Sequence, residues 1–160
     1  IAAAVALARK LGIGMSAIQH AVSELGYVEH RLEMKLHRDM VLIDDAFNAN
    51  PEGAAAACDV LAQMPGWRIL VTPGMIDLGE QQEQFNRCLG THAAGCADEV
   101  ILVGGKQVQP LRQGLLEGGF DEDRIGQVMT MQEAFACFEQ SPHADKVVLI
   151  ENDVPDVLNR

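Results

Sequence analysis

The chain has 160 residues, of which 48% are hydrophobic and 22% are charged, a composition typical of a folded domain rather than a disordered or fibrous protein. Twelve Lys and Arg residues stand against 23 Asp and Glu residues, so the net charge is -11 and the pI is about 4.7. This charge would repel a polyanion and excludes an ordinary nucleic-acid groove. No apolar run approaches the length of a bilayer span, so the sequence predicts no membrane insertion.

The cysteine spacing bears on the cellular compartment of the protein, and the first residues bear on whether the sequence is part of a longer chain. The four cysteines show neither C-x-x-C spacing nor pairing with a nearby His, so we expect reduced, partly buried thiols in a cytoplasmic protein. They are Cys58, Cys88, Cys96 and Cys137. The chain opens on Ile1 in Ala-rich sequence without an initiator Met or a basic segment, which does not resemble a signal peptide. We therefore expect a piece of a longer protein.

Residues 1–26 predict two short helices. The helices lie on either side of Gly12-Ile13-Gly14, and Ser16 with Gln19 has the spacing of a capping box at the start of the second helix. Isolated helices of this length are marginal in water, so we expect them to be the end of a domain that lies mostly outside this sequence. Residues 27–32 lack clear periodicity and are expected to form an interdomain linker.

Residues 33–160 alternate between strand and helix patterns and predict one domain. Apolar segments predict strands at 32–36, 40–45, 68–72, 100–103, 125–129 and 146–150. Among the helices between them, one begins with Asn50 as N-cap before Pro51, and another begins with the capping-box pair Thr130 and Glu133. Apolar strands separated by helices favour an α/β fold, a doubly wound, mostly parallel sheet with helices on both faces.

The helix expected after Gly79 bears on metal binding. Its pattern places Phe85, Cys88, Leu89, His92 and Cys96 along one apolar face. We therefore expect His92 to be a buried, hydrogen-bonded residue rather than a ligand. The other histidines are scattered without metal-ligand spacing, so the sequence predicts no zinc site.

Several polar residues fall at the carboxyl ends of the expected strands, where open parallel sheets bind ligands. They are Asp45, Asn48 and Asn50 after the strand at 40–45, Asp77 after 68–72, and Glu151 and Asn152 after 146–150. Carboxylates and amides at these positions could hold sugar hydroxyls or a hydrated metal. Ordinary turn chemistry explains any single one of them at least as well.

Two further features concern nucleotide binding. Gly104-Gly105-Lys106 lacks the G-x-x-x-x-G-K-[ST] spacing, and no G-x-G-x-x-G follows an expected strand, so we find no phosphate loop in this sequence. Arg31 is a lone cation in the expected linker, close in sequence to Asp44 and Asp45. The residues alone leave two interpretations of Arg31 open, a functional contact and a surface salt bridge.

Four segments carry a specific family resemblance. Ile43–Pro51 reads IDDAFNANP and resembles the I-D-D-S-Y-N-A-N-P signature of the Mur ligases. His30–Glu33 resembles the family's G-R-L-E linker, Gly74–Glu80 its G-D-M-L-E-L-G-E loop, and Val100–Gly104 the V-I-L-V-G strand that follows. The segments occur in the family's order, and the resemblance covers essentially the whole chain. The N-A-N-P segment is most similar to the MurF type.

The resemblance implies an ATP-dependent amide ligase of cell-wall precursor synthesis. The MurF type joins D-alanyl-D-alanine to UDP-N-acetylmuramoyl-tripeptide, so these small molecules are the expected partners. ATP and Mg²⁺ are the implied cofactors, held mostly by a central ATPase domain that precedes Ile1 in the family. Because the phosphate loop, the magnesium ligands and the carbamylated lysine belong to that domain, we expect no catalytic residue here and no ligase activity from this chain alone.

The resemblance also assigns individual residues. Arg31 matches a linker Arg that reaches the nucleotide, and Asp45 matches an aspartate that holds the ATP ribose. Asn48 and Asn50 match the adjacent N-A-N segment and are expected to bind ATP with them. For the acceptor pocket, the hypothesis names Asp77, Glu151 and Asn152 as substrate-binding residues.

One departure from the family leaves the substrate open. The segment Glu151–Asp156 replaces the K-G-S-R of the standard MurF type, so an expected basic loop is acidic here. One alternative is therefore a MurF-like paralogue with another acceptor. Another is a non-catalytic scaffold or regulatory subunit that keeps the fold. A free-standing small-ligand module fits less well, because it has no need of an interdomain Arg.

Overall fold

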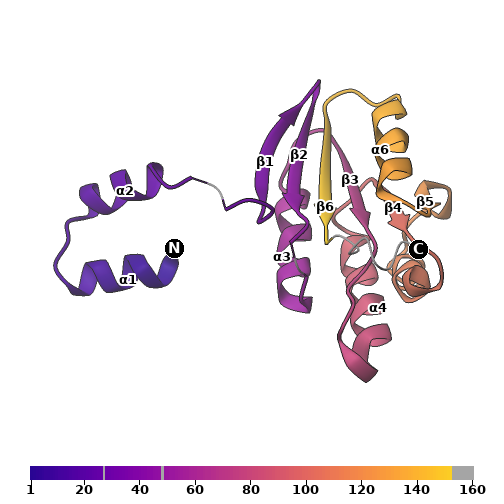
Figure 1. Ribbon diagram of the computed structural model, residues 1–160, viewed down its shortest axis with the longest axis horizontal. Helices are drawn as coiled ribbons and strands as arrows, with labels where there is room; N and C mark the ends of the chain where they lie inside the picture. Colours follow the sequence, from indigo (N-terminus) through magenta and orange to yellow (C-terminus); the bar gives the residue numbers. More distant parts are fainter. Residues whose placement is uncertain (27, 48, 153–160) are drawn as a thin grey trace.

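The structure, a computed structural model, describes residues 1–26, 28–47 and 49–152 (Figure 1). The strands are β1 (Glu33–His37), β2 (Met40–Asp45), β3 (Trp67–Thr72), β4 (Glu99–Val103), β5 (Ile125–Val128) and β6 (Lys146–Glu151). The helices are α1 (Ala2–Lys10), α2 (Met15–Ser23), α3 (Pro51–Ala62), α4 (Gln82–Ala93), α5 (Gln109–Glu117) and α6 (Met131–Gln140). Short 3₁₀ turns lie at Gly79–Gln81, Lys106–Val108 and Glu122–Arg124.

The six strands form one sheet in the order β1-β2-β6-β3-β4-β5. Only the β1–β2 hairpin is antiparallel, and the other four pairs of neighbours run parallel. The sheet order brings the last strand, β6, between β2 and β3, so Glu151 lies beside Asp45. The predicted doubly wound α/β fold is confirmed, and its strand boundaries differ from the expected ones by at most one residue.

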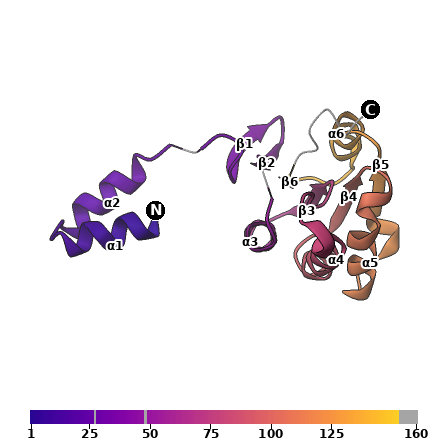
Figure 2. The same cartoon turned by 60° about the horizontal axis from the view of Figure 1, so that its bottom comes forward.

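Helices cover both faces of the sheet, as Figure 2 shows. On one face, α3, α4 and α5 pack residues such as Leu61, Leu89 and Leu111 against the sheet. On the other face, α6 packs Ala134 and Phe138. Successive strand residues point to opposite faces, so β3 contributes Leu70 to the first core and its neighbours to the second.

Two of three predicted helix starts are confirmed. The Asn50 side-chain oxygen accepts a hydrogen bond from Gly53 N–H at 2.9 Å, and Pro51 is the first residue of α3. Thr130 begins α6 with both bonds of a capping box. The capping box predicted at Ser16 is wrong, because the N-cap of α2 is Gly14, two residues earlier, which places Ser16 inside the first turn.

The predicted buried face of α4 is partly wrong: Phe85, Leu89 and Cys96 pack in the core as predicted, but Cys88 and His92 do not. Asn86, Leu89, Gly90 and Ala93 are buried, whereas Cys88 and His92 are exposed. The helix turns Gly90 toward α5, where an added Cβ would lie 2.2 Å from the carbonyl oxygen of Leu111. Glycines let the two backbones approach closely, and a search for hydrophobic periodicity overlooks such a contact.

The four cysteines are free, but only half of them fit the expectation of partial burial. Cys58 and Cys96 are buried, whereas Cys88 and Cys137 are exposed. Cys88 is exposed because α4 is rotated about its axis relative to the predicted face. Cys137 lies on α6, whose buried residues are Ala134 and Phe138.

The two N-terminal helices lie apart from the sheet in Figure 1. Their apolar side chains are largely exposed, with Ile18 the only buried residue of the pair among the described residues. No helix in the described part of the chain combines the length and the hydropathy needed to cross a bilayer.

Candidate functional site

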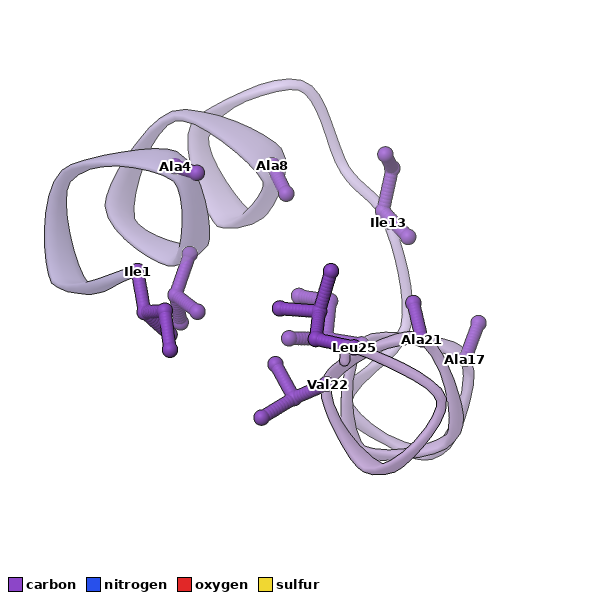
Figure 3. Close-up of a pocket in the computed structure, with 10 residues that line it drawn as sticks. Ile1, Ala4, Ala8, Ile13, Ala17, Ala21, Val22 and Leu25 are labelled. Atoms are coloured by element: carbon purple, nitrogen blue, oxygen red, sulfur yellow. The ribbon is translucent and has the colours of Figure 1, made fainter. Parts of the chain in front are cut away.

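The cavity between α1 and α2 offers no polar chemistry. Figure 3 shows it as a hollow between the two helices, and its lining is entirely aliphatic. The lining residues are Ile1, Ala4, Val5, Ala8, Ile13, Ala17, Ile18, Ala21, Val22 and Leu25. A charged or sugar-bearing ligand would lose its hydrogen bonds to water there without replacement. The polar residues at the carboxyl edge of the sheet are the better candidates for a binding site.

Asp45 ends β2 at that edge and ties the linker to the sheet. Its Oδ1 accepts a hydrogen bond from Leu32 N–H at 3.0 Å, and its carbonyl oxygen accepts one from Asn152 N–H at 3.2 Å. A carboxylate can accept further hydrogen bonds, so these contacts leave Asp45 able to bind hydroxyl groups. Because Arg31 directly precedes Leu32, the two predicted nucleotide-binding residues lie at the same corner of the domain.

Arg31 is exposed, and its guanidinium lies 4.5 Å from the centre of the Phe47 ring. Such a cation–π contact orients the guanidinium while leaving its N–H donors available. The segment around it is fixed by backbone hydrogen bonds from Phe47 N–H to His30 and from Arg31 N–H to Val28. His30 and Leu32 both have positive φ, so the linker makes a sharp bend beside β2.

A charged cluster around Asp44 lies next to this corner. The Asp44 Oδ2 atom lies 2.9 Å from both Lys35 Nζ and His30 Nδ1. Burial by itself raises the pKa of Asp44, but the hydrogen bonds from Lys35 and His30 outweigh it and hold the pKa below its usual value. This cluster was not predicted from the sequence, since only the pairing of β1 with β2, which sets Lys35 opposite Leu42, brings the Lys35 ammonium within reach of Asp44.

Glu151 at the end of β6 is the most deeply buried acid of the edge, with 1% of its surface exposed. Among the described residues its Oε2 atom has no hydrogen-bond partner. Burial raises its pKa to about 9, and the negative charge of neighbouring Asp45 adds to the shift. Glu151 therefore carries a proton near neutral pH and presents an uncharged acid beside Asp45.

Asn152 holds the loop that follows β3. Its side-chain N–H donates to the carbonyl oxygen of Gly74 at 2.9 Å, and the residue is buried in a positive-φ conformation. Asn86 fixes the same loop through hydrogen bonds to both backbone groups of Met75. A Cβ at Gly74 would lie 2.6 Å from Asn86 Oδ1, so the loop requires glycine there. Asn152 thus links the ends of β3 and β6.

The remaining predicted site residues are placed differently. The Asn50 side-chain oxygen accepts the N-cap hydrogen bond of α3, so this atom has a structural role. Asp77 is exposed at positive φ in the loop after β3. Asn48 lies outside the described residues. The structure thus brings Asp45, Glu151 and Asn152 together with the linker, and their roles in binding remain predictions.

This corner fits the chemistry of a nucleotide. An exposed guanidinium suits a phosphate or an adenine ring, and a strand-end carboxylate suits ribose hydroxyls. The chain's acidic net charge makes a local cation such as Arg31 the natural contact for an anion.

Comparison with known proteins agrees with this interpretation of the fold. The family described as "Mur ligase, glutamate ligase domain" matches residues 30–154. The UDP-N-acetylmuramoyl-tripeptide--D-alanyl-D-alanine ligase of Escherichia coli (strain K12) is 37% identical over 106 residues, which are 66% of this chain and 24% of that protein. The ligase of the same name from Bacillus subtilis (strain 168) is 24% identical over 93% of this chain and 33% of its own length.

Solved structures share the fold. MurF from Acinetobacter baumannii has a TM-score of 0.75 at 24% identity, over 94% of this chain and 33% of that one. The MurF ligase of Thermotoga maritima in complex with ADP also has a TM-score of 0.75, at 19% identity, over 93% of this chain and 33% of that one. This chain therefore spans a quarter to a third of the length of these relatives. Since the family match runs from the linker through the last strand, the chain belongs to the Mur ligase family.

Proposed function

We propose that this chain is the C-terminal part of an ATP-dependent amide ligase that joins D-alanyl-D-alanine to UDP-N-acetylmuramoyl-tripeptide in the cytoplasm. The observation that carries the proposal is the hydrogen bond from Leu32 N–H to Asp45 Oδ1, which fixes the Arg31-bearing linker against the end of β2. Support for the substrates comes from the Escherichia coli relative, whose name states that reaction.

In this proposal the chain's own residues bind and orient the nucleotide. Asp45 accepts hydrogen bonds from the ribose, and Arg31 contacts the nucleotide from the linker. ATP supplies the phosphoryl group that activates the carboxylate for attack by the incoming amine. Positioning and charge neutralisation account for the catalytic contribution of this part of the protein.

The proposal divides the chain into three parts. Residues 1–26 are the last helices of a central ATPase domain, residues 27–32 are the linker, and residues 33–160 are the ligase domain. The exposed apolar surfaces of α1 and α2 support the first assignment, since such surfaces are normally covered. Mg²⁺ and most ATP contacts then belong to the central domain. The 160-residue chain alone is expected to lack ligase activity and to bind nucleotide weakly.

Phosphate release by the full-length protein tests the proposal. The assay supplies ATP, Mg²⁺ and UDP-N-acetylmuramoyl-tripeptide, with and without D-alanyl-D-alanine. Release that requires both substrates supports the proposal. Failure to release phosphate with these substrates, from a protein that binds ATP, would instead support a role as scaffold or regulatory subunit.

The burial of Glu151 favours a second candidate, a MurF-like enzyme with another acceptor. An uncharged acid at the carboxyl edge, rather than a cation, offers no charge attraction to an anionic peptide. Phosphate release with an amidated or cationic acceptor, but not with D-alanyl-D-alanine, would support this candidate.

A further inference from the structure

Three side chains of types that can bind a metal ion lie together at helix ends rather than at the strand ends. Asp59 is in the last turn of α3, His92 is in the last turn of α4, and Cys96 follows α4 by one turn. His92 and Cys96 are four residues apart and so share a side of the α4 end, which faces α3. Figure 1 shows α3 and α4 on the same side of the sheet.

The three potential ligand atoms converge. His92 Nε2 lies 2.8 Å from Asp59 Oδ1, and all three ligand atoms lie within 4.8 Å of one another. In a tetrahedral zinc site with ordinary bond lengths, pairs of ligand atoms are about 3.4–3.6 Å apart. Asp59 and His92 both face solvent, so their side chains have room to rotate toward that spacing.

The donor set is selective. One imidazole nitrogen, one carboxylate oxygen and one sulfur favour a borderline ion such as Zn²⁺ over the hard ions Mg²⁺ and Ca²⁺, which prefer oxygen alone. We propose that Asp59, His92 and Cys96 form a binding site for Zn²⁺ or a similar transition-metal ion, with water as the fourth ligand. This departs from the sequence-based expectation of no zinc site, which treated His92 as buried.

Burial and hydrogen bonds fix the position of Cys96. Cys96 is 6% exposed, and its N–H donates to the carbonyl oxygen of Ala93 at 2.9 Å. Its thiol donates to the backbone carbonyl oxygen of His92 at 3.4 Å, and its sulfur lies within 4.8 Å of the imidazole ligand atom. A ligand held in this way needs little reorganisation to bind a metal.

The site is independent of the proposed nucleotide corner. Helix α3 begins after β2 and α4 begins after β3, so both start at the carboxyl edge of the sheet, and their last turns lie at the opposite edge. An ion there would join the ends of α3 and α4 without touching Asp45. Its expected effect is stabilisation of the fold, and failure of the ligase proposal would leave it unaffected.

Cobalt titration of the 160-residue chain tests the proposal. Bound Co²⁺ reports tetrahedral geometry through its visible bands and a thiolate ligand through a charge-transfer band, and Zn²⁺ should displace it. We expect Cys96→Ser to abolish the charge-transfer band. We expect His92→Gln to weaken Co²⁺ binding by about tenfold or more. Zn²⁺ should also raise the melting temperature of the wild type but not of Cys96→Ser.

Two exposed cysteines supply matched controls. Cys88→Ser and Cys137→Ser should keep the charge-transfer band and the Zn²⁺ stabilisation, since neither thiol belongs to the cluster. A band that survives Cys96→Ser, or that disappears in either control, would overturn the assignment. So would a wild type that shows no thiolate band, or whose melting temperature does not respond to Zn²⁺. Circular dichroism of each variant checks that it is folded.

Discussion

Two carboxyl groups on neighbouring strands are both buried, yet their pKa values shift in opposite directions. Asp44 on β2 is 8% exposed, and Glu151 on β6 is 1% exposed. Lys35 and His30 surround Asp44 and hold its pKa below the usual value. Glu151 faces the acid Asp45 without a neighbouring cation among the described residues, and its pKa rises to about 9.

The difference shows that partners, rather than depth alone, decide the charge of a buried acid. The β1–β2 hairpin places the cation Lys35 beside Asp44, so Asp44 is ionised. No described residue places a cation beside Glu151, which stays neutral. The proposed nucleotide corner lies between them at Asp45.

The largest effect is expected from Glu151→Gln. Glu151 keeps its proton to about pH 9 when folded, but ionises near the ordinary glutamate pKa of 4.5 when unfolded. Its stabilising contribution is thus complete below about pH 4.5 and is lost as pH rises toward 9, at up to about 1.4 kcal/mol per pH unit. Glutamine carries no charge, so the variant should exceed the wild type in stability at pH 8 by about 2–4 kcal/mol.

Urea denaturation at pH 5 and pH 8 measures this effect. The exposed residue Glu83 offers a control, because Glu83→Gln should leave the pH dependence of the free energy of unfolding as it is in the wild type. Equal pH dependence in Glu151→Gln and the wild type would show that Glu151 is ionised in the folded protein.

Asp45→Ala in the full-length protein should impair ATP use without unfolding it. Loss of a charge-assisted hydrogen bond to the ribose should lower kcat/KM for ATP by about 10- to 150-fold, or about 1.5–3 kcal/mol. The matched control is Asp39→Ala, in the exposed β1–β2 turn at the other end of the hairpin. Unchanged ATP kinetics in Asp45→Ala would remove Asp45 from the site.

Asp44→Asn should destabilise the fold by about 1–2 kcal/mol at pH 7, since it loses charge-assisted hydrogen bonds with Lys35 and His30. The sign follows from the lowered pKa of Asp44. Its contribution is present above its unfolded value of 3.8 and is lost as pH falls below it. The stability difference between wild type and variant should therefore shrink at pH 3. A constant difference would show that the charge of Asp44 contributes nothing.

The smallest effect is expected at the exposed margin of the corner. Phe47→Leu removes the cation–π contact with Arg31 and should cost about 0.5–1 kcal/mol. Thermal denaturation of Phe47→Leu measures the loss. The same substitution in an Arg31→Gln background should have a smaller effect, and equal losses in both backgrounds would show that the contact is not stabilising.

Local signals account for what the sequence could predict. Asn50 before Pro51 and Thr130 with Glu133 specify helix starts through hydrogen bonds within four residues, and the structure has both. The apolar strands and the family signature likewise lie in single short segments. These features need no knowledge of how distant segments pair.

Features that depend on tertiary pairing were missed or wrong. No local pattern shows that β6 inserts beside β2, which places Glu151 against Asp45. Cys88 and His92 were wrongly assigned to the buried face of α4, because the close packing of Gly90 against α5 is not visible in the hydrophobic pattern. The contact between Asp59 and His92 could not be predicted, because it depends on the packing of α3 against α4.

The central claim is that the linker and the end of β2 act on one nucleotide. A double-mutant cycle of Arg31→Ala and Asp45→Ala in the full-length protein, read as kcat/KM for ATP, tests it most directly. If both side chains contact the same bound ATP, the double variant should lose less than the sum of the two single losses, with a coupling of about 0.5–3 kcal/mol. Strictly additive losses, or no loss in either single variant, would contradict the claim.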